Sequence, residues 1–120
     1  PNVYFDVAHN DDSIIAFCHT IDSLNHRGDK TLIISVQKSK LIEKSIKQLE
    51  QRFSKIIITQ LNNRMYTSID LASMFLSQSK IEIIDDSNLA IKTGFKNSKK
   101  SDLLAIIGSH YWGDIVYKNF

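Results

Sequence analysis

The stretch Leu103-Leu104-Ala105-Ile106-Ile107-Gly108-Ser109 decides the fold, because it is an apolar run that ends directly in a glycine and a serine. Two shorter runs of the same kind, Leu32-Ile33-Ile34 and Ile56-Ile57-Ile58, precede it in the chain. None of the three alternates with polar residues. Continuous apolar runs of this length are typical of strands that are buried on both faces, as in a parallel sheet covered by helices.

Strand-like and helix-like segments alternate along the whole chain. The predicted strands are Val3–Val7, Thr31–Val36, Lys55–Gln60, Lys80–Asp85 and Leu103–Gly108. The segments between them carry apolar residues at three- and four-residue steps, which is typical of amphipathic helices. This order predicts an α/β fold, a Rossmann-like three-layer sandwich with a mostly parallel sheet of five to six strands and helices on both faces. We expect Gly28 to cap the end of the first helix and Cys18 to be a small core residue within it.

Length and composition limit the classes of function. The chain has 120 residues with 15 Lys and Arg against 13 Asp and Glu, a net charge of +2. This length fits one domain, residues 1–120, and the near-neutral charge argues against nucleic acid or an anionic membrane surface as a partner. No apolar run approaches the roughly 20 residues that span a bilayer, and no signal sequence opens the chain. A single cysteine excludes an internal disulfide and fits a reducing compartment, so we expect a cytoplasmic protein.

The first predicted strand ends in Asp6-Val7-Ala8-His9-Asn10, where ligands bind in open α/β sheets. The carboxylate of Asp6 is close enough in sequence to orient the imidazole of His9, and Asn10 can cap the following helix. Such a pair can bind phosphate oxygens, a ribose or a substrate amine. The alternative is that Asp6 and Asn10 only satisfy free backbone amides at the turn, and that His9 completes it.

The last predicted strand leads into a second polar turn, Gly108-Ser109-His110-Tyr111. Glycine permits a tight turn at a strand end, and Ser109 is a small donor suited to a carboxylate or a phosphate. We expect Tyr111 and Trp112 to serve packing, in the core or in a lid.

Several sharper motifs are absent. Gly108 and Gly113 have the outer spacing of a phosphate-binding P-loop, but Asp114-Ile115 replaces the required Lys-Ser or Lys-Thr pair. The four histidines are not at zinc-ligand spacing, and we expect no metal site in this chain. A phospho-receiver domain needs an aspartate at the end of the third strand, where Thr59-Gln60 stands.

The motif Asp6-Val7-Ala8-His9-Asn10 resembles the Asp-x-Ala-His-Asn sequence that opens the C-terminal domain of folylpolyglutamate synthases and bifunctional dihydrofolate synthases, members of the Mur ligase superfamily. The resemblance continues in order through nearly the whole chain. Leu32–Lys40 resembles a strand followed by a glycine and an Asp-Lys-Asp loop. Ile56–Arg64 resembles a strand that ends in threonine with an arginine a few residues on, and Gly108-Ser109-x-Tyr111 resembles the closing Gly-Ser-x-Tyr turn.

The chain departs from the family pattern in two loops. Ser39 and Leu41 replace both acidic residues of the Asp-Lys-Asp loop, so that only Lys40 remains in register. Ser35 stands in place of the glycine, and Asp11 replaces the usual proline after the first motif. A divergent or weakened enzyme is therefore one alternative.

The resemblance implies an ATP-dependent ligase that adds L-glutamate to folate, or acts on dihydropteroate, through an acyl phosphate. It implies that Asp6 and His9 are catalytic and face the phosphates, and that Asn10 holds their turn. It implies that Lys40 and Ser109 lie nearer the incoming glutamate. ATP and Mg²⁺ would be bound mainly by an N-terminal ATPase domain, the partner that this chain lacks. We therefore expect residues 1–120 to be the C-terminal domain of a larger, monomeric enzyme and to be inactive alone.

Two alternatives remain open at this point. A Mur-type ligase of peptidoglycan precursors would share the fold and the acyl-phosphate chemistry, and a non-catalytic α/β binding module would share the fold only. His9 within its motif favours the folate branch, whereas the missing P-loop and the altered loop around Lys40 favour the binding module. A start at Pro1 without methionine indicates a cut chain, so the sequence upstream would discriminate between them.

Overall fold

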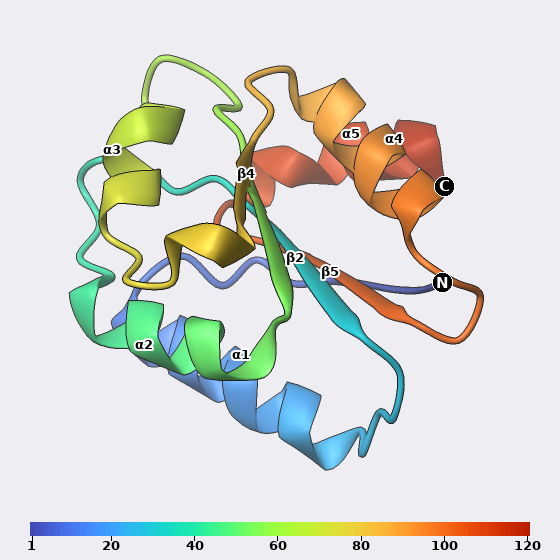
Figure 1. Ribbon diagram of the computed structural model, residues 1–120. Helices are drawn as coiled ribbons and strands as arrows, with labels where there is room; N and C mark the ends of the chain where they lie inside the picture. Colours follow the sequence, from blue (N-terminus) through green and yellow to red (C-terminus); the bar gives the residue numbers. More distant parts are fainter.

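A parallel sheet forms the centre of the structure, a computed structural model that describes residues 1–120. The strand order is β1-β5-β2-β3-β4, and every neighbouring pair is parallel (Figure 1). The strands are β1 (Asn2–Phe5), β2 (Lys30–Ile34), β3 (Lys55–Ile58), β4 (Ile81–Ile83) and β5 (Leu103–Ile107). The predicted α/β sandwich is confirmed, with five strands and no antiparallel one.

Four α-helices connect the strands, a fifth follows β5, and together they cover both faces of the sheet. They are α1 (Asp11–Ser23), α2 (Glu43–Arg52), α3 (Ser68–Ser73), α4 (Ser87–Asn97) and α5 (Gly113–Asn119), with short 3₁₀ turns at Gln78–Lys80 and His110–Trp112. Figure 1 shows α1 and α2 together on one side of the sheet and α4 and α5 on the other. None of these helices is both long enough and apolar enough to cross a membrane.

The continuous apolar runs divide their side chains between two cores. Leu32 and Ile34 pack with α1, α2 and α3 on one face, while Ile33 between them packs with α4 and Trp112 on the other. Successive strand side chains point to opposite faces, so a strand covered on both sides needs apolar residues at every position. Complete burial of each such side chain contributes about 1.5–3 kcal/mol.

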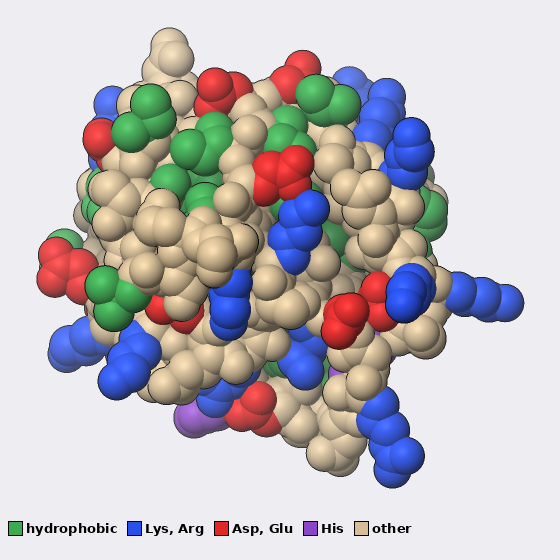
Figure 2. Space-filling view, viewed as in Figure 1, with side chains coloured by type: hydrophobic (Ala, Val, Ile, Leu, Met, Phe, Trp, Pro, Cys, Tyr) green, Lys and Arg blue, Asp and Glu red, His purple; other side chains and the backbone are tan.

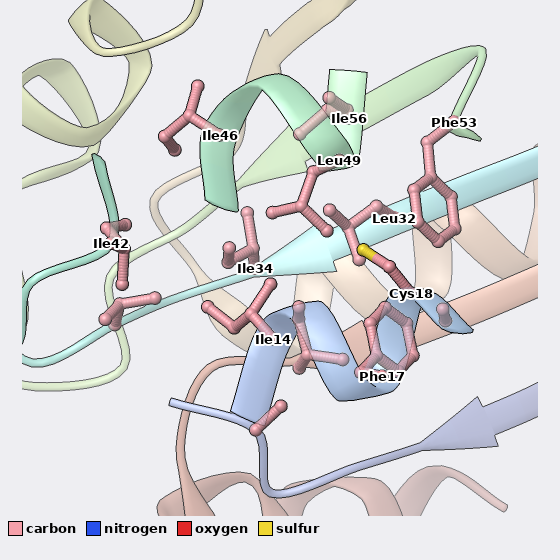
Figure 3. Packing of buried hydrophobic residues seen from close by; sticks show 14 of the residues in the cluster. Ile14, Phe17, Cys18, Leu32, Ile34, Ile42, Ile46, Leu49, Phe53 and Ile56 are labelled. Carbon is pink, nitrogen blue, oxygen red and sulfur yellow. The ribbon is translucent and has the colours of Figure 1, made fainter. Parts of the chain in front are cut away.

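Aromatic and sulfur-bearing side chains fill the core between α1 and α2 (Figure 3). The rings of Phe17 and Phe53 stack with their centroids 6.1 Å apart and their planes nearly parallel. Cys18 is fully buried beside them, as predicted, and this burial raises the pKa of its thiol to about 11. The thiol therefore behaves as a small apolar group.

Gly28 does not cap the first helix, so that prediction is wrong. Helix α1 ends at Ser23, and the residue in the left-handed conformation after it is Asn25, with φ of 49°. Gly28 instead lies against the loop before β5, where a Cβ atom would be 2.4 Å from the carbonyl oxygen of Ser101. The glycine is needed there because two backbone segments approach closely.

Charged side chains are spread over the surface. Figure 2 shows Lys and Arg side chains among Asp and Glu side chains on the visible face, without one dominant patch. Two ion pairs join neighbouring elements: Arg52 to Asp22 at 2.9 Å between α2 and α1, and Lys55 to Glu82 at 2.8 Å between β3 and β4.

The strand order creates a crevice at the carboxyl edge of the sheet. Strand β5 lies between β1 and β2. The chain leaves β1 and β2 towards helices on one face, whereas it leaves β5 towards α5 on the opposite face (Figure 1). Ligands of open α/β sheets bind where neighbouring strands diverge in this way.

Candidate functional site

Three loops converge on a small cavity at this crevice. Its volume is about 80 Å³, and no apolar side chain lines it. The lining residues come from the ends of β1, β2 and β5: His9, Gln37, Lys40, Gly108, Ser109 and His110. Cavities for whole ligands usually measure about 300–1,000 Å³, so this one has room for a single group such as a phosphoryl or a carboxylate.

The turn after β5 forms the floor of the cavity, and Gly108 is the residue that makes it possible. Its φ is +116°, and a Cβ atom there would lie 2.0 Å from the carbonyl oxygen of Ser35, the residue directly after β2. Ser109 is buried, and its Oγ accepts a hydrogen bond from the Tyr111 amide at 3.1 Å. Its own hydroxyl hydrogen has no acceptor within the chain, so it can donate to a ligand. The predicted tight turn is confirmed.

The loop after β1 presents His9 to the cavity in a defined tautomer. The ring Nδ1 lies 2.9 Å from the carbonyl oxygen of Val7, which only accepts hydrogen bonds, so Nδ1 carries the hydrogen. The other ring nitrogen, Nε2, has no partner within the chain. It can accept a proton when the ring is neutral and donate one when the ring is charged.

The expected hydrogen bond between Asp6 and His9 does not form, so this part of the prediction is wrong. Asp6 Oδ1 accepts instead from the Ala8 amide at 2.8 Å, and the His9 ring is held by a backbone carbonyl. Asp6 therefore stabilises the turn that carries His9 and does not line the cavity.

Asn10 caps α1, as predicted. Its side chain accepts from the Ser13 amide at 3.0 Å, and Ser13 Oγ accepts in return from the Asn10 amide at 3.1 Å. Asn10 lines a separate open groove of about 340 Å³, on the other side of Lys40. Of the five predicted site residues, the cavity thus brings together His9, Lys40 and Ser109, while Asp6 and Asn10 hold the turn beside it.

Lys40 keeps its place although its neighbours depart from the family pattern. Its amide donates to the Gln37 carbonyl at 3.0 Å, and its own carbonyl accepts from the Tyr66 hydroxyl at 3.0 Å. The loop is further joined to the next strand's loop by a hydrogen bond from the Lys38 amide to the Arg64 carbonyl at 3.0 Å. These backbone contacts do not require acidic side chains.

Sequence reasoning missed several polar side chains at the same edge. Gln37 and His110 line the cavity, and Arg64 donates to the Tyr111 hydroxyl at 2.8 Å beside it. Arg64 and Tyr111 line an open groove of about 500 Å³. Tyr111 packs against the His110 ring at the surface, with ring centroids 4.4 Å apart, and Trp112 is fully buried as predicted. Position in the loop after a strand was the available signal for Gln37 and His110, and the family resemblance also contained Arg64 and Tyr111.

The site is rich in hydrogen-bond donors. Lys40, Ser109 and Gln37 carry N–H or O–H groups suited to an oxyanion, and His9 Nε2 adds a further donor when its ring is charged. These groups fit a phosphoryl or carboxylate oxygen, but the cavity is too small for a whole nucleotide. No three His, Cys, Asp or Glu side chains are grouped so that they could hold a metal ion.

Comparison with solved structures shows where this fold occurs. The chain is similar to Escherichia coli FolC in complex with DHPP and ADP, with 21% identity, a TM-score of 0.88, and coverage of 99% of this chain and 28% of that chain. It is similar to a bifunctional folylpolyglutamate synthase/dihydrofolate synthase from Yersinia pestis, with 17% identity, a TM-score of 0.84, and coverage of 98% and 28%. A folylpolyglutamate synthase from Mycobacterium tuberculosis gives 18% identity, a TM-score of 0.79, and coverage of 99% and 29%.

At these identities the likeness shows the shared fold, and the chain spans less than a third of the length of each of these structures. No curated protein matches the sequence significantly. The family comparison reaches further, because residues 1–110 match the family described as "Mur ligase, glutamate ligase domain". This family match covers nearly the whole chain, and the chain shares its fold with the matching part of FolC. The chain therefore belongs to the glutamate ligase domain family of the Mur ligases.

Proposed function

We propose that this chain is the C-terminal domain of a larger ATP-dependent ligase that adds L-glutamate to folate or to dihydropteroate. The observation that carries the proposal is the convergence of His9, Lys40 and Ser109 from three strand ends on one cavity without apolar lining. Family membership and the fold shared with folylpolyglutamate synthases support it. We further propose that the complete enzyme is a cytoplasmic monomer.

In this proposal the cavity receives the anionic group of an activated carboxylate. ATP supplies the phosphoryl group that turns the folate carboxylate into an acyl phosphate. The Lys40 ammonium and the Ser109 hydroxyl then donate to the oxygens of that group and hold it for attack, while Nε2 of the neutral His9 ring is available to accept a proton. The amine of glutamate attacks the acyl carbon, the C–N bond forms, the C–O bond to phosphate breaks, and phosphate leaves. Neutral His9 takes the proton that the amine releases.

The groove beside the cavity suits the incoming amino acid. Arg64 presents a guanidinium group there, and a guanidinium matches a carboxylate with two parallel hydrogen bonds. Tyr111 holds Arg64 at 2.8 Å and limits its freedom. We therefore assign a glutamate carboxylate to Arg64.

The rest of the machinery belongs to other parts of the enzyme. This chain has no P-loop and no group of side chains for a metal ion. We assign the nucleotide base, most of the phosphate contacts and Mg²⁺ to an N-terminal ATPase domain. The role of Asp6 and Asn10 is to hold the turn that carries His9.

The test replaces His9 by alanine in the complete ligase and measures ATP-dependent glutamate ligation. Turnover should fall at least roughly tenfold, a threshold set below the roughly 10²–10⁴-fold that a positioned acid–base group typically contributes. His19→Ala, on the exposed face of α1, is the matched control and should change nothing. The 120-residue chain alone should fold but ligate no glutamate. Normal turnover of the His9 variant would return His9 to a purely structural role.

Two alternative functions predict a different activity for the complete protein. A Mur-type ligase would use a peptidoglycan precursor in place of folate, and the family match covers that branch too. A non-catalytic binding module is favoured by the missing P-loop and by the altered residues Ser39 and Leu41. Ligation assays with folate and with a peptidoglycan precursor distinguish all three, because the module would form neither product.

A further inference from the structure

Asp11, the first residue of α1, joins this helix to the start of α2. Its backbone N–H donates to the Leu41 carbonyl at 3.1 Å. Its Oδ1 accepts from the Ser45 amide at 2.9 Å and also from the Ser45 hydroxyl. Ser45 is fully buried; its hydroxyl depends on Asp11 for an acceptor, and its amide is shared between Asp11 and the Ile42 carbonyl at 3.0 Å.

Helix α2 needs this contact because it lacks a cap of its own. Its N-cap residue is Ile42, whose side chain makes no capping hydrogen bond. The amide of the third helical residue, here Ser45, is one that an N-cap side chain normally binds. Asp86 does this in the ordinary way for α4, where it accepts from the Leu89 amide at 2.9 Å. Asp11 performs the same task for α2 from a different helix, 34 residues away from Ser45 in the chain.

The backbone hydrogen bond from Asp11 to Leu41 joins the segment that carries His9 to the loop that carries Lys40. Asp11 follows His9 by two positions, and the carbonyl that it binds belongs to Leu41, the residue after Lys40. The Leu41 side chain is 74% exposed, so packing of that side chain does not hold the loop in place. We propose that Asp11 is a positioning residue that sets the separation of His9 and Lys40 across the cavity. The reaction that this positioning serves rests on the proposed function.

The first test measures amide hydrogen exchange in the 120-residue chain. Asp11→Ala should speed exchange of both the Ser45 and the Lys40 amides roughly tenfold or more, as expected for loss of a charged acceptor. Asp86→Ala removes a cap of matched geometry and should speed the Leu89 amide while leaving Lys40 unchanged. Asp11→Asn keeps the Oδ1 acceptor and should restore slow exchange at Lys40. Faster exchange at Ser45 with an unchanged Lys40 would reduce Asp11 to a helix cap and overturn the proposal.

The second test measures glutamate kinetics in the complete protein. Asp11→Ala should raise the KM for glutamate roughly tenfold more than it lowers kcat, because in the proposed function Lys40 lies on the side of the cavity from which the amino acid enters. Asp86→Ala should leave both constants unchanged. Equal effects of the two alanine variants would overturn the positioning role. A wild-type protein that ligates no glutamate would refute the proposed function instead, and the exchange test alone would then decide the role of Asp11.

Discussion

Replacement of Gly108 by alanine tests the link between the fold and the site. Gly108 ends β5, lines the cavity and has a φ of +116°. Holding a residue that has a Cβ atom in such a backbone conformation costs about 1–3 kcal/mol of folding free energy. The added Cβ would also lie 2.0 Å from the carbonyl oxygen of Ser35, and this backbone oxygen cannot rotate away because Ser35 directly follows β2 and its amide binds the Ile107 carbonyl.

These two effects add, because the strain belongs to residue 108 and the clash pushes β5 away from β2. We expect a loss of at least about 3 kcal/mol, a large part of the roughly 5–15 kcal/mol by which domains are stable. At roughly 4 °C per kcal/mol for a chain of this size, the melting temperature should fall by about 10 °C or more.

Circular dichroism during heating and urea titration would measure this change. Gly113→Ala is the matched control, since Gly113 is already helical with φ of −49° and a Cβ there meets nothing within 4 Å. That variant should be unchanged or slightly more stable, because alanine reduces the freedom of the unfolded chain. An alanine at position 108 that melts within about 2 °C of the wild type would refute the reasoning about the turn.

Two predictions concern pH and reactivity. Hydrogen bonding from Arg52 lowers the pKa of the Asp22 carboxyl in the folded chain. The ion pair therefore stabilises the fold fully above the ordinary aspartate pKa of about 3.9, and its stabilisation is lost as the pH falls through the lowered pKa of the folded state. Acid titration followed by circular dichroism should therefore show a shallower loss of stability below about pH 4 in Asp22→Asn than in the wild type; identical curves would contradict this. Burial raises the pKa of Cys18 to about 11, so stability should decline as the pH rises from about 8.5 towards that value. At pH 8 a thiol reagent should label Cys18 rapidly in urea and very slowly in the folded chain; rapid labelling of the folded chain would contradict the burial.

Local pattern was enough to predict the elements, and the reason is that strand and helix periodicity are properties of neighbouring residues. The runs around Ile33 and Ile106 were predicted as buried strands and are. Predictions that depended on side-chain partners did less well. Gly28 was expected to cap a helix that in fact ends earlier. Asp6 was expected to bind His9, but the Asp6 carboxylate binds the Ala8 amide and the His9 ring binds the Val7 carbonyl, both of which are nearer.

The sequence by itself determined that polar residues would follow buried strands at one edge of a sheet, because parallel strands all end there. Only the tertiary structure decided which of those ends meet. Strand β5 is inserted between β1 and β2, so Ser109 comes to lie with His9 and Lys40 in one cavity. The contact of Asp11 with Ser45, and that of Arg64 with Tyr111, likewise join residues far apart in the chain. Such pairs depend on strand order and helix packing, which no local periodicity encodes.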